Sequence, residues 1–171
     1  MTKRESLAYA AGIIDGEGHV GITKRRPKAM RSPKYTVRLG VDMTNRKALS
    51  FLQKLFSISS SKFGIGKRYR KNHKPIFILG LENDSAVALC KAVLPFLLVK
   101  KEQAEIIISC RKMQNATKGT RRVYVGTMKA VGNRSGMVPI RELSASYLNK
   151  CERLYKRIKK LNKRFKKGER A

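Results

Sequence analysis

Two acidic residues, Asp15 and Glu17, end a short apolar segment near the start of an otherwise strongly basic chain. Gly16 and Gly18 alternate with them, and glycine readily ends a helix. Carboxylates at a helix C-terminus lie at the unfavourable end of the helix dipole. Their placement here therefore indicates a chemical role. Oxygen ligands from Glu17 and a nearby backbone carbonyl suit Mg²⁺, which completes its shell with water and substrate phosphate. An ordinary surface turn is the alternative interpretation.

The segment before these acids has the spacing of a helix with one very small face. We expect this helix to cover residues 7–14, with Ser6 as its N-cap. Glycine inside a helix costs roughly 1 kcal/mol relative to alanine, which is acceptable where a second backbone must approach closely. The residues of this face are Ala8, Ala11, Gly12 and Asp15.

Composition restricts the partner. The 171 residues include 40 Lys and Arg and 11 Asp and Glu, which gives a formal net charge of +29. This excess favours a polyanionic partner, nucleic acid before an anionic membrane surface. A hydrophobic content of 42% excludes a disordered basic tail. The longest apolar run, residues 92–99, is too short for a membrane span. We find no targeting segment and expect an intracellular protein, in the cytoplasm or in an organelle that holds its nucleic acid.

Alternation and helical spacing then give the elements that must position the acids. Two strands, each with one apolar and one basic face, form a predicted antiparallel hairpin that directly follows the acidic turn. A helix, a second hairpin and two further helices follow, in the order α-β-β-α-β-β-α-α. The expected ranges are strands 19–26 and 35–43, helix 46–56, strands 64–71 and 76–81, and helices starting near Asp84 and Lys101.

The C-terminal third differs in composition. Residues 114–138 are rich in glycine and basic residues, and they are long for a structureless loop, so we expect them to be functional or to be ordered by a ligand. Pro139 suits the first turn of a final amphipathic helix. We therefore expect one domain, with a core at 1–113 and a basic extension, loop then helix, at 114–171.

Cys90, Cys110 and Cys151 are widely spaced and odd in number. This spacing argues against a zinc site or a disulfide framework and favours a reducing compartment. Each lies in an apolar helical pattern, so we expect three small buried side chains.

The segment Ala10-Ala11-Gly12-Ile13-Ile14-Asp15-Gly16-Glu17-Gly18 resembles the LAGLIDADG motif of homing endonucleases. The order of elements up to Met113 is also similar to that family. The last acid of the motif is Glu here, where Asp is commoner. The resemblance implies an α+β fold: an α-β-β-α-β-β-α core whose antiparallel sheet forms a DNA-binding saddle, plus extra C-terminal helices.

The same resemblance implies sequence-specific cleavage of double-stranded DNA by metal-dependent phosphodiester hydrolysis. Glu17 would bind Mg²⁺ with the Gly16 carbonyl assisting, and Mn²⁺ or Ca²⁺ could replace Mg²⁺ for binding. Asp15 would have a structural role at the helix end. No small-molecule cofactor and no membrane are implied.

Three further groups match positions of the family near the reacting phosphate. Lys100 resembles the lysine placed there, with Lys101 as its rival. Asn45 resembles a polar residue that positions water or phosphate, and Arg46 or Lys47 would supply a basic partner. Ordinary contacts with the DNA backbone or with solvent are the alternative for each.

A single motif implies two subunits. The small face would pack against its own copy in an isologous contact, which places one Glu17 per DNA strand near the dyad. A radius of gyration of ~16 Å makes each subunit roughly 40 Å across, so a dimer covers about 20 base pairs of a pseudo-palindromic site.

The polar faces of the hairpins would read the DNA, because arginine suits guanine edges and lysine anchors phosphates. Periodicity does not decide which residues of the second hairpin face the DNA. The candidates are His19, Thr23, Arg25, Thr36, Arg38, Gly40, Arg46, Lys47, Lys67, Arg68, Tyr69, Arg70 and Lys71.

Two other classes fit the charge. A maturase-like or regulatory DNA-binding protein could keep this scaffold without cleaving, although its Glu17 would then be unexplained. A ribosomal-type RNA-binding protein also has a high charge and a basic terminal helix, but it has no need for a small helix face that ends in acids.

Overall fold

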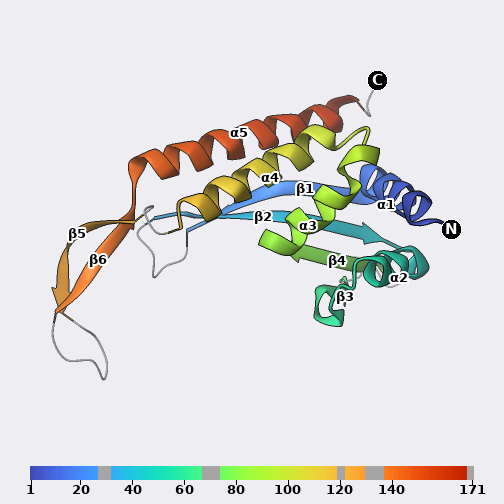
Figure 1. Ribbon diagram of the computed structural model, residues 1–171, viewed down its shortest axis with the longest axis horizontal. Coiled ribbons are helices and arrows are strands. Elements are labelled where there is room, and N and C mark those ends of the chain that lie inside the picture. Colours follow the sequence, from blue (N-terminus) through green and yellow to red (C-terminus); the bar gives the residue numbers. More distant parts are fainter. Residues whose placement is uncertain (27–31, 67–73, 119–121, 130–136, 169–171) are drawn as a thin grey trace.

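The computed structural model describes residues 1–26, 32–66, 74–118, 122–129 and 137–168 (Figure 1). The helices and strands follow the order that the sequence predicts as far as the fourth helix. Their bounds are α1 Lys3–Glu17, β1 Gly18–Arg25, β2 Lys34–Met43, α2 Arg46–Leu55, β3 Phe63–Ile65, β4 Phe77–Glu82, α3 Asn83–Val93, α4 Lys101–Ala116, β5 Arg122–Lys129, β6 Met137–Leu143 and α5 Ala145–Gly168, with 3₁₀ turns at Ser60–Lys62 and Leu94–Phe96.

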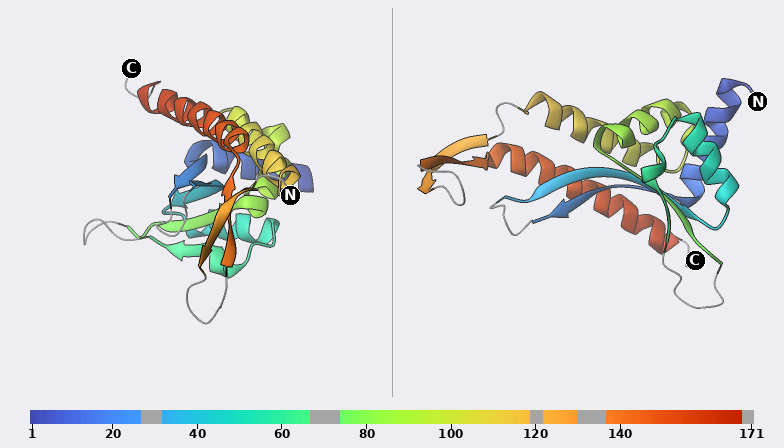
Figure 2. Two further views of the ribbon diagram at one scale, coloured as in Figure 1. Left: turned by 90° about the vertical axis from the view of Figure 1, so that its left-hand side faces the viewer. Right: turned by 90° about the horizontal axis from the view of Figure 1, so that it is seen from below.

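A four-stranded antiparallel sheet forms the centre of the molecule, in the order β1-β2-β4-β3. Helices α1, α3, α4 and α5 lie on one face of this sheet, and the other face is free of them (Figures 1 and 2). The buried side chains of Val37, Leu39 and Val41 on β2 alternate with the residues of the uncovered face. The predicted α-β-β-α-β-β-α core with an antiparallel sheet and further C-terminal helices is confirmed.

Helix α1 is longer than the sequence pattern predicts. It begins at Lys3, because Thr2 and Glu5 form a reciprocal capping box, and Ser6 is therefore not the N-cap. Ser6 instead lies inside the helix, where its hydroxyl donates to the Thr2 carbonyl oxygen. The helix ends at Glu17 and is followed by the C-cap Gly18, where a Cβ would collide with the Ile14 carbonyl oxygen. Glycine at this position allows β1 to start directly after the acidic turn.

The segment predicted as a loop contains a second sheet. β5 and β6 pair as an antiparallel two-stranded ribbon between α4 and α5. Pro139 lies within β6 opposite Thr127, so the prediction that it starts the last helix is wrong. Helix α5 begins at Ala145, and the Ser144 hydroxyl accepts a hydrogen bond from the Tyr147 N–H at 3.3 Å.

Contacts with β1 and β2 hold α5 along the edge of the sheet. Asn162 Nδ2 donates to the Val20 carbonyl oxygen at 3.1 Å. Glu152 accepts from Lys24 at 2.8 Å and from the Tyr35 hydroxyl. Burial and this hydrogen bond raise the pKa of Tyr35, so its hydroxyl stays a donor at neutral pH.

None of the three cysteines forms a disulfide, and all three are buried, as predicted. Burial raises the pKa of the Cys90 thiol to about 12, and a hydrogen bond with Cys151 together with burial raises the pKa of Cys110. High thiol pKa values leave these groups protonated and unreactive at neutral pH. In the described ranges, no helix has the length and apolar character of a membrane span.

Candidate metal site and nucleic-acid interface

Glu17 is the last residue of α1, and its side chain is exposed at the junction with β1. Gly16 is exposed beside it, and a Cβ on Gly16 would meet open space. No described residue forms an ion pair or side-chain hydrogen bond with the Glu17 carboxylate. Within the described part of the chain, no group of three His, Cys, Asp or Glu side chains could hold a metal ion. One subunit thus offers one carboxylate and a neighbouring carbonyl, a set that suits a partly hydrated Mg²⁺ and leaves room for a second carboxylate.

The carboxylate of Asp15, the other acid of the turn, is hydrogen-bonded within the subunit. Its carboxylate accepts hydrogen bonds from the backbone N–H groups of Leu98 and Lys100, both at 2.8 Å. The Lys100 ammonium also donates to the Asp15 carbonyl oxygen. Asp15 therefore ties the turn before α4 to the end of α1, and it brings Lys100 to the acidic end of that helix. Lys101, the rival, is exposed on the first turn of α4.

His19 lies on the uncovered face, two residues after Glu17. Its ring covers Gly40 on the neighbouring strand, where a Cβ would overlap the imidazole. Burial lowers the pKa of His19; Asp42 opposes this shift, while Arg38 and Lys100 add to it. Gly40 itself is buried beneath the ring and admits it, and its contact with DNA stays a prediction.

The other predicted DNA-binding residues of the first hairpin differ in exposure and in the partners that they already have. Arg25 is exposed at the end of β1, and Thr23 is half-buried with its hydroxyl donating to the Thr36 carbonyl oxygen at 3.3 Å. Arg38 pairs with Glu82 on β4 at 3.3 Å, so this guanidinium must exchange its partner to reach a base. Thr36 is only 9% exposed, and its role as a reading residue stays a prediction.

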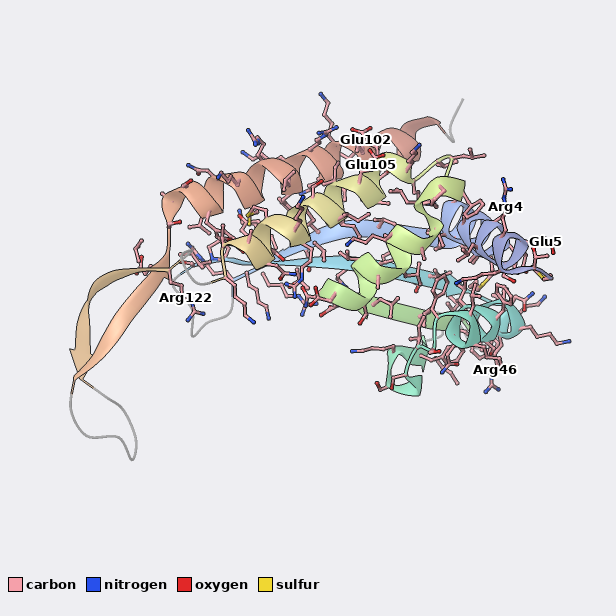
Figure 3. The ribbon with its side chains drawn as sticks, viewed as in Figure 1. Arg4, Glu5, Arg46, Glu102, Glu105 and Arg122 are labelled. Carbon is pink, nitrogen blue, oxygen red and sulfur yellow. The ribbon has the colours of Figure 1, made fainter. Side chains whose placement is uncertain are left out.

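Asn45 is the N-cap of α2. Its side-chain oxygen accepts from the backbone N–H groups of Lys47 and Ala48 at 3.0 and 3.4 Å. The Asn45 oxygen is thus occupied in starting the helix, while its amide group lies at the surface. Arg46 is exposed, and its guanidinium lies 5.9 Å from the centre of the Phe77 ring. Figure 3 shows Arg46 on the outer side of α2.

The candidates of the second hairpin lie outside the described residues. They are Lys67, Arg68, Tyr69, Arg70 and Lys71.

Helix α1 exposes a stripe of small residues, but these are not all the residues that the sequence predicts. Ala8 and Gly12 are exposed and Asp15 is half-buried, whereas Ala11 is completely buried inside the subunit. A Cβ on Gly12 would meet nothing within 4 Å. The exposed stripe consists of Ala8, Gly12 and Gly16, at i, i+4 and i+8, because the core takes Ala11 for its own packing.

Three exposed apolar side chains near this stripe were not predicted. Tyr9 is 50% exposed on α1, and Leu98 and Val99 are 88% and 46% exposed in the turn that Asp15 holds. The sequence did carry a signal for two of them. The apolar run 92–99 continues through Leu98 and Val99, beyond the residues that a core helix would bury. Apolar groups exposed together indicate a contact surface.

No protein-family model and no curated protein matches the sequence. Solved structures do match the fold. The homing endonuclease I-CvuI, in complex with the I-CreI target with Mg²⁺ and uncleaved DNA, is 18% identical with a TM-score of 0.65, over 93% of this chain and 83% of that one. The archaeal intron-encoded homing endonuclease I-Vdi141I, complexed with DNA, is 14% identical with a TM-score of 0.55, over 67% of this chain and 72% of that one. The LAGLIDADG homing endonuclease I-GzeII, in complex with its DNA target, is 12% identical with a TM-score of 0.52, over 67% of this chain and 38% of that one. The chain therefore has the fold of the LAGLIDADG homing endonucleases.

Proposed function

We propose that this protein is a homodimeric, divalent-metal-dependent endonuclease that cleaves both strands of a long, pseudo-palindromic DNA site. The observation that carries the proposal is the exposed carboxylate of Glu17, which pairs with no described residue and lies at the end of α1, directly before β1 of the four-stranded sheet. A carboxylate placed there on a protein of charge +29 repels DNA unless a cation joins the two.

Dimerisation completes the site. The exposed stripe of Ala8, Gly12 and Gly16 lets two copies of α1 approach closely about a two-fold axis, and Tyr9 and Leu98 add apolar area beside it. Such a contact brings the two Glu17 side chains together at the dyad. Two carboxylates with water and phosphate oxygens make a ligand set that Mg²⁺ accepts.

Each group near the dyad has a separate task. Glu17 and the Gly16 carbonyl would hold the metal, which when bound supplies positive charge at the phosphate and lowers the pKa of water. Asp15 positions Lys100, whose ammonium can stabilise charge that develops on the phosphate. His19, its ring fixed on Gly40, faces the DNA between this centre and the reading residues of β1.

The uncovered face supplies the binding surface. Arg25, Arg38 and Thr23 point to the side away from the helices, while Arg46 and Lys47 lie exposed on α2. Arginines suit base edges in the major groove, and the α2 cations suit phosphates. The structural likeness to DNA-bound homing endonucleases supports this orientation.

Selection from a randomised duplex library tests the proposal. Duplexes cut in Mg²⁺ are recovered and sequenced, with a parallel reaction in EDTA. We expect a two-fold consensus of about 20 base pairs that is cut only with the metal. Enrichment by binding without cutting would indicate a non-cleaving DNA-binding protein. Preference for structured RNA over every duplex would indicate an RNA-binding protein.

A further inference from the structure

The ribbon of β5 and β6 stands away from the rest of the molecule. The two strands pair with each other from Arg122 opposite Leu143 to Lys129 opposite Met137. They contact the other described elements only slightly, and they project beyond the end of the four-stranded sheet (Figures 1 and 2). An isolated two-stranded ribbon is at best marginally stable in water. The ribbon therefore gains little from its own subunit.

The charge of this segment indicates the class of its partner. Residues 121–143 contain five Lys and Arg and one Glu. Arg122, at the root of the ribbon, is exposed (Figure 3). Val123 beside it is 45% exposed, so the root also presents apolar surface. Basic charge with exposed apolar surface on a two-stranded ribbon fits a nucleic-acid groove.

The position of the ribbon indicates which nucleic acid it meets. β1 starts at Gly18, beside Glu17, and ends at Arg25, opposite Lys34 on β2. The ribbon starts near this far end of the sheet, and in Figure 1 it turns toward the side of the uncovered face. In a dimer joined through α1, the two ribbons would lie at the two outer ends of the DNA-binding surface.

We propose that each ribbon grips duplex DNA immediately outside the segment that the four-stranded sheet covers. This inference rests on the proposed function and adds a second contact area to it. The eight residues of β5 extend over roughly 26 Å, the length of about eight base pairs. The register shifts between Tyr124 and Gly126, and such a bulge increases strand twist, which suits a ribbon that follows a groove.

The pairing of β5 with β6 shows where the ribbon can be removed from the protein. Arg122 and Leu143 are paired, so residues 123–142 can be replaced by Asn-Gly, a two-residue hairpin turn, without separating α4 from α5. The truncated and full-length proteins are compared by hydroxyl-radical footprinting in Ca²⁺ on the selected site with long flanks. We expect the truncated protein to lose protection of roughly five base pairs at each outer end. Its affinity should fall at least ~10-fold with the cut positions unchanged.

Salt dependence separates a phosphate contact from an effect on folding. The triple variant Arg122→Gln, Lys129→Gln, Arg141→Gln keeps the ribbon and should flatten the slope of log K against log salt by ~0.9 for each lost phosphate contact. The matched control changes three exposed cations of α5, Lys150→Gln, Arg153→Gln and Lys160→Gln, on the side of the sheet that carries the helices. We expect the control to keep the outer footprint and the parent slope.

The outcomes distinguish this inference from the proposed function. If the full-length protein protects a site and the truncated and triple variants give the same footprint and slope, the ribbon is not a DNA contact and the proposal is overturned, while the endonuclease remains. If the full-length protein protects no duplex, the proposed function fails and the ribbon proposal fails with it. Should the truncated protein unfold, the triple variant alone decides.

Discussion

The carboxylate of Asp15 and the backbone N–H of Lys100 are joined by a 2.8 Å hydrogen bond across 85 residues of chain. The Lys100 ammonium returns to the carbonyl oxygen of the same aspartate. This pair makes the end of α1 and the start of α4 one unit. The placement of the Lys100 ammonium at the end of α1, next to the exposed Glu17, therefore depends on Asp15.

Replacing Asp15 by Asn should loosen this junction. An amide can accept one of the two N–H groups, but its own N–H₂ would face the other. Hydrogen bonds to a charged acceptor contribute about 1.5 to 3 kcal/mol, and we expect a loss of about 2 kcal/mol in the free energy of unfolding. Urea unfolding measures it. An unchanged midpoint would show that the junction does not depend on Asp15.

Gly12→Leu should block dimerisation while leaving the subunit folded. A side chain at this position meets nothing in the subunit, whereas it would separate two α1 helices. Sedimentation at micromolar concentration should give a dimer for the parent and a folded monomer for the variant. Ser109→Leu, on an exposed position of α4, is the control and should remain dimeric. A dimeric Gly12→Leu protein would place the interface elsewhere.

Gly40→Ala should release the His19 ring. Because the ring is the end of a flexible side chain, it can swing away, and the free energy of unfolding should change by less than about 1 kcal/mol. Burial lowers the pKa of His19, so a released ring should titrate at higher pH, nearer its usual range. NMR titration follows this shift, with His73→Gln used to assign the signal. An unchanged His19 pKa would contradict the stacked geometry.

The ion pair between Asp84 and Arg111 gives a prediction for stability at low pH. Two hydrogen bonds from Arg111, at 2.6 and 2.8 Å, lower the pKa of Asp84 to about 2. A carboxyl with a lowered folded-state pKa contributes stability above its unfolded-state pKa, near 3.8, and loses it as pH falls to about 2. The difference in free energy of unfolding between the parent and Asp84→Asn should therefore be constant above about pH 4 and shrink below it. A difference independent of pH would argue against the pair.

The core could be predicted because its signals are local. Alternation marks β1 and β2, and helical spacing marks α2 and α3. The ribbon of β5 and β6 was missed because the bulge between Tyr124 and Gly126 interrupts its alternation and because the ribbon contacts the other described elements only slightly. The segment was predicted as a loop, and Pro139 then suggested a helix start.

The site could be predicted only in part. The motif places Glu17 and Gly16 together by sequence alone, but the partners of Asp15 lie 83 and 85 residues away. Thr36 and Gly40 share the outward parity of β2 with Arg38, and parity alone predicted that all three are available. Parity does not give the cross-strand neighbours, which place His19 over Gly40 and Glu82 beside Arg38.

Cleavage by Glu17→Gln tests the central claim most directly. On the selected duplex in Mg²⁺, the variant should cut at least ~10³-fold more slowly than the parent, because loss of one group that stabilises transition-state charge typically costs this much. Binding in Ca²⁺ should be retained, and Glu105→Gln, the same change at an exposed acid of α4, should cut at the parent rate. Cutting by Glu17→Gln at the parent rate would contradict the account, because the acid at the end of α1 would then have no part in the reaction.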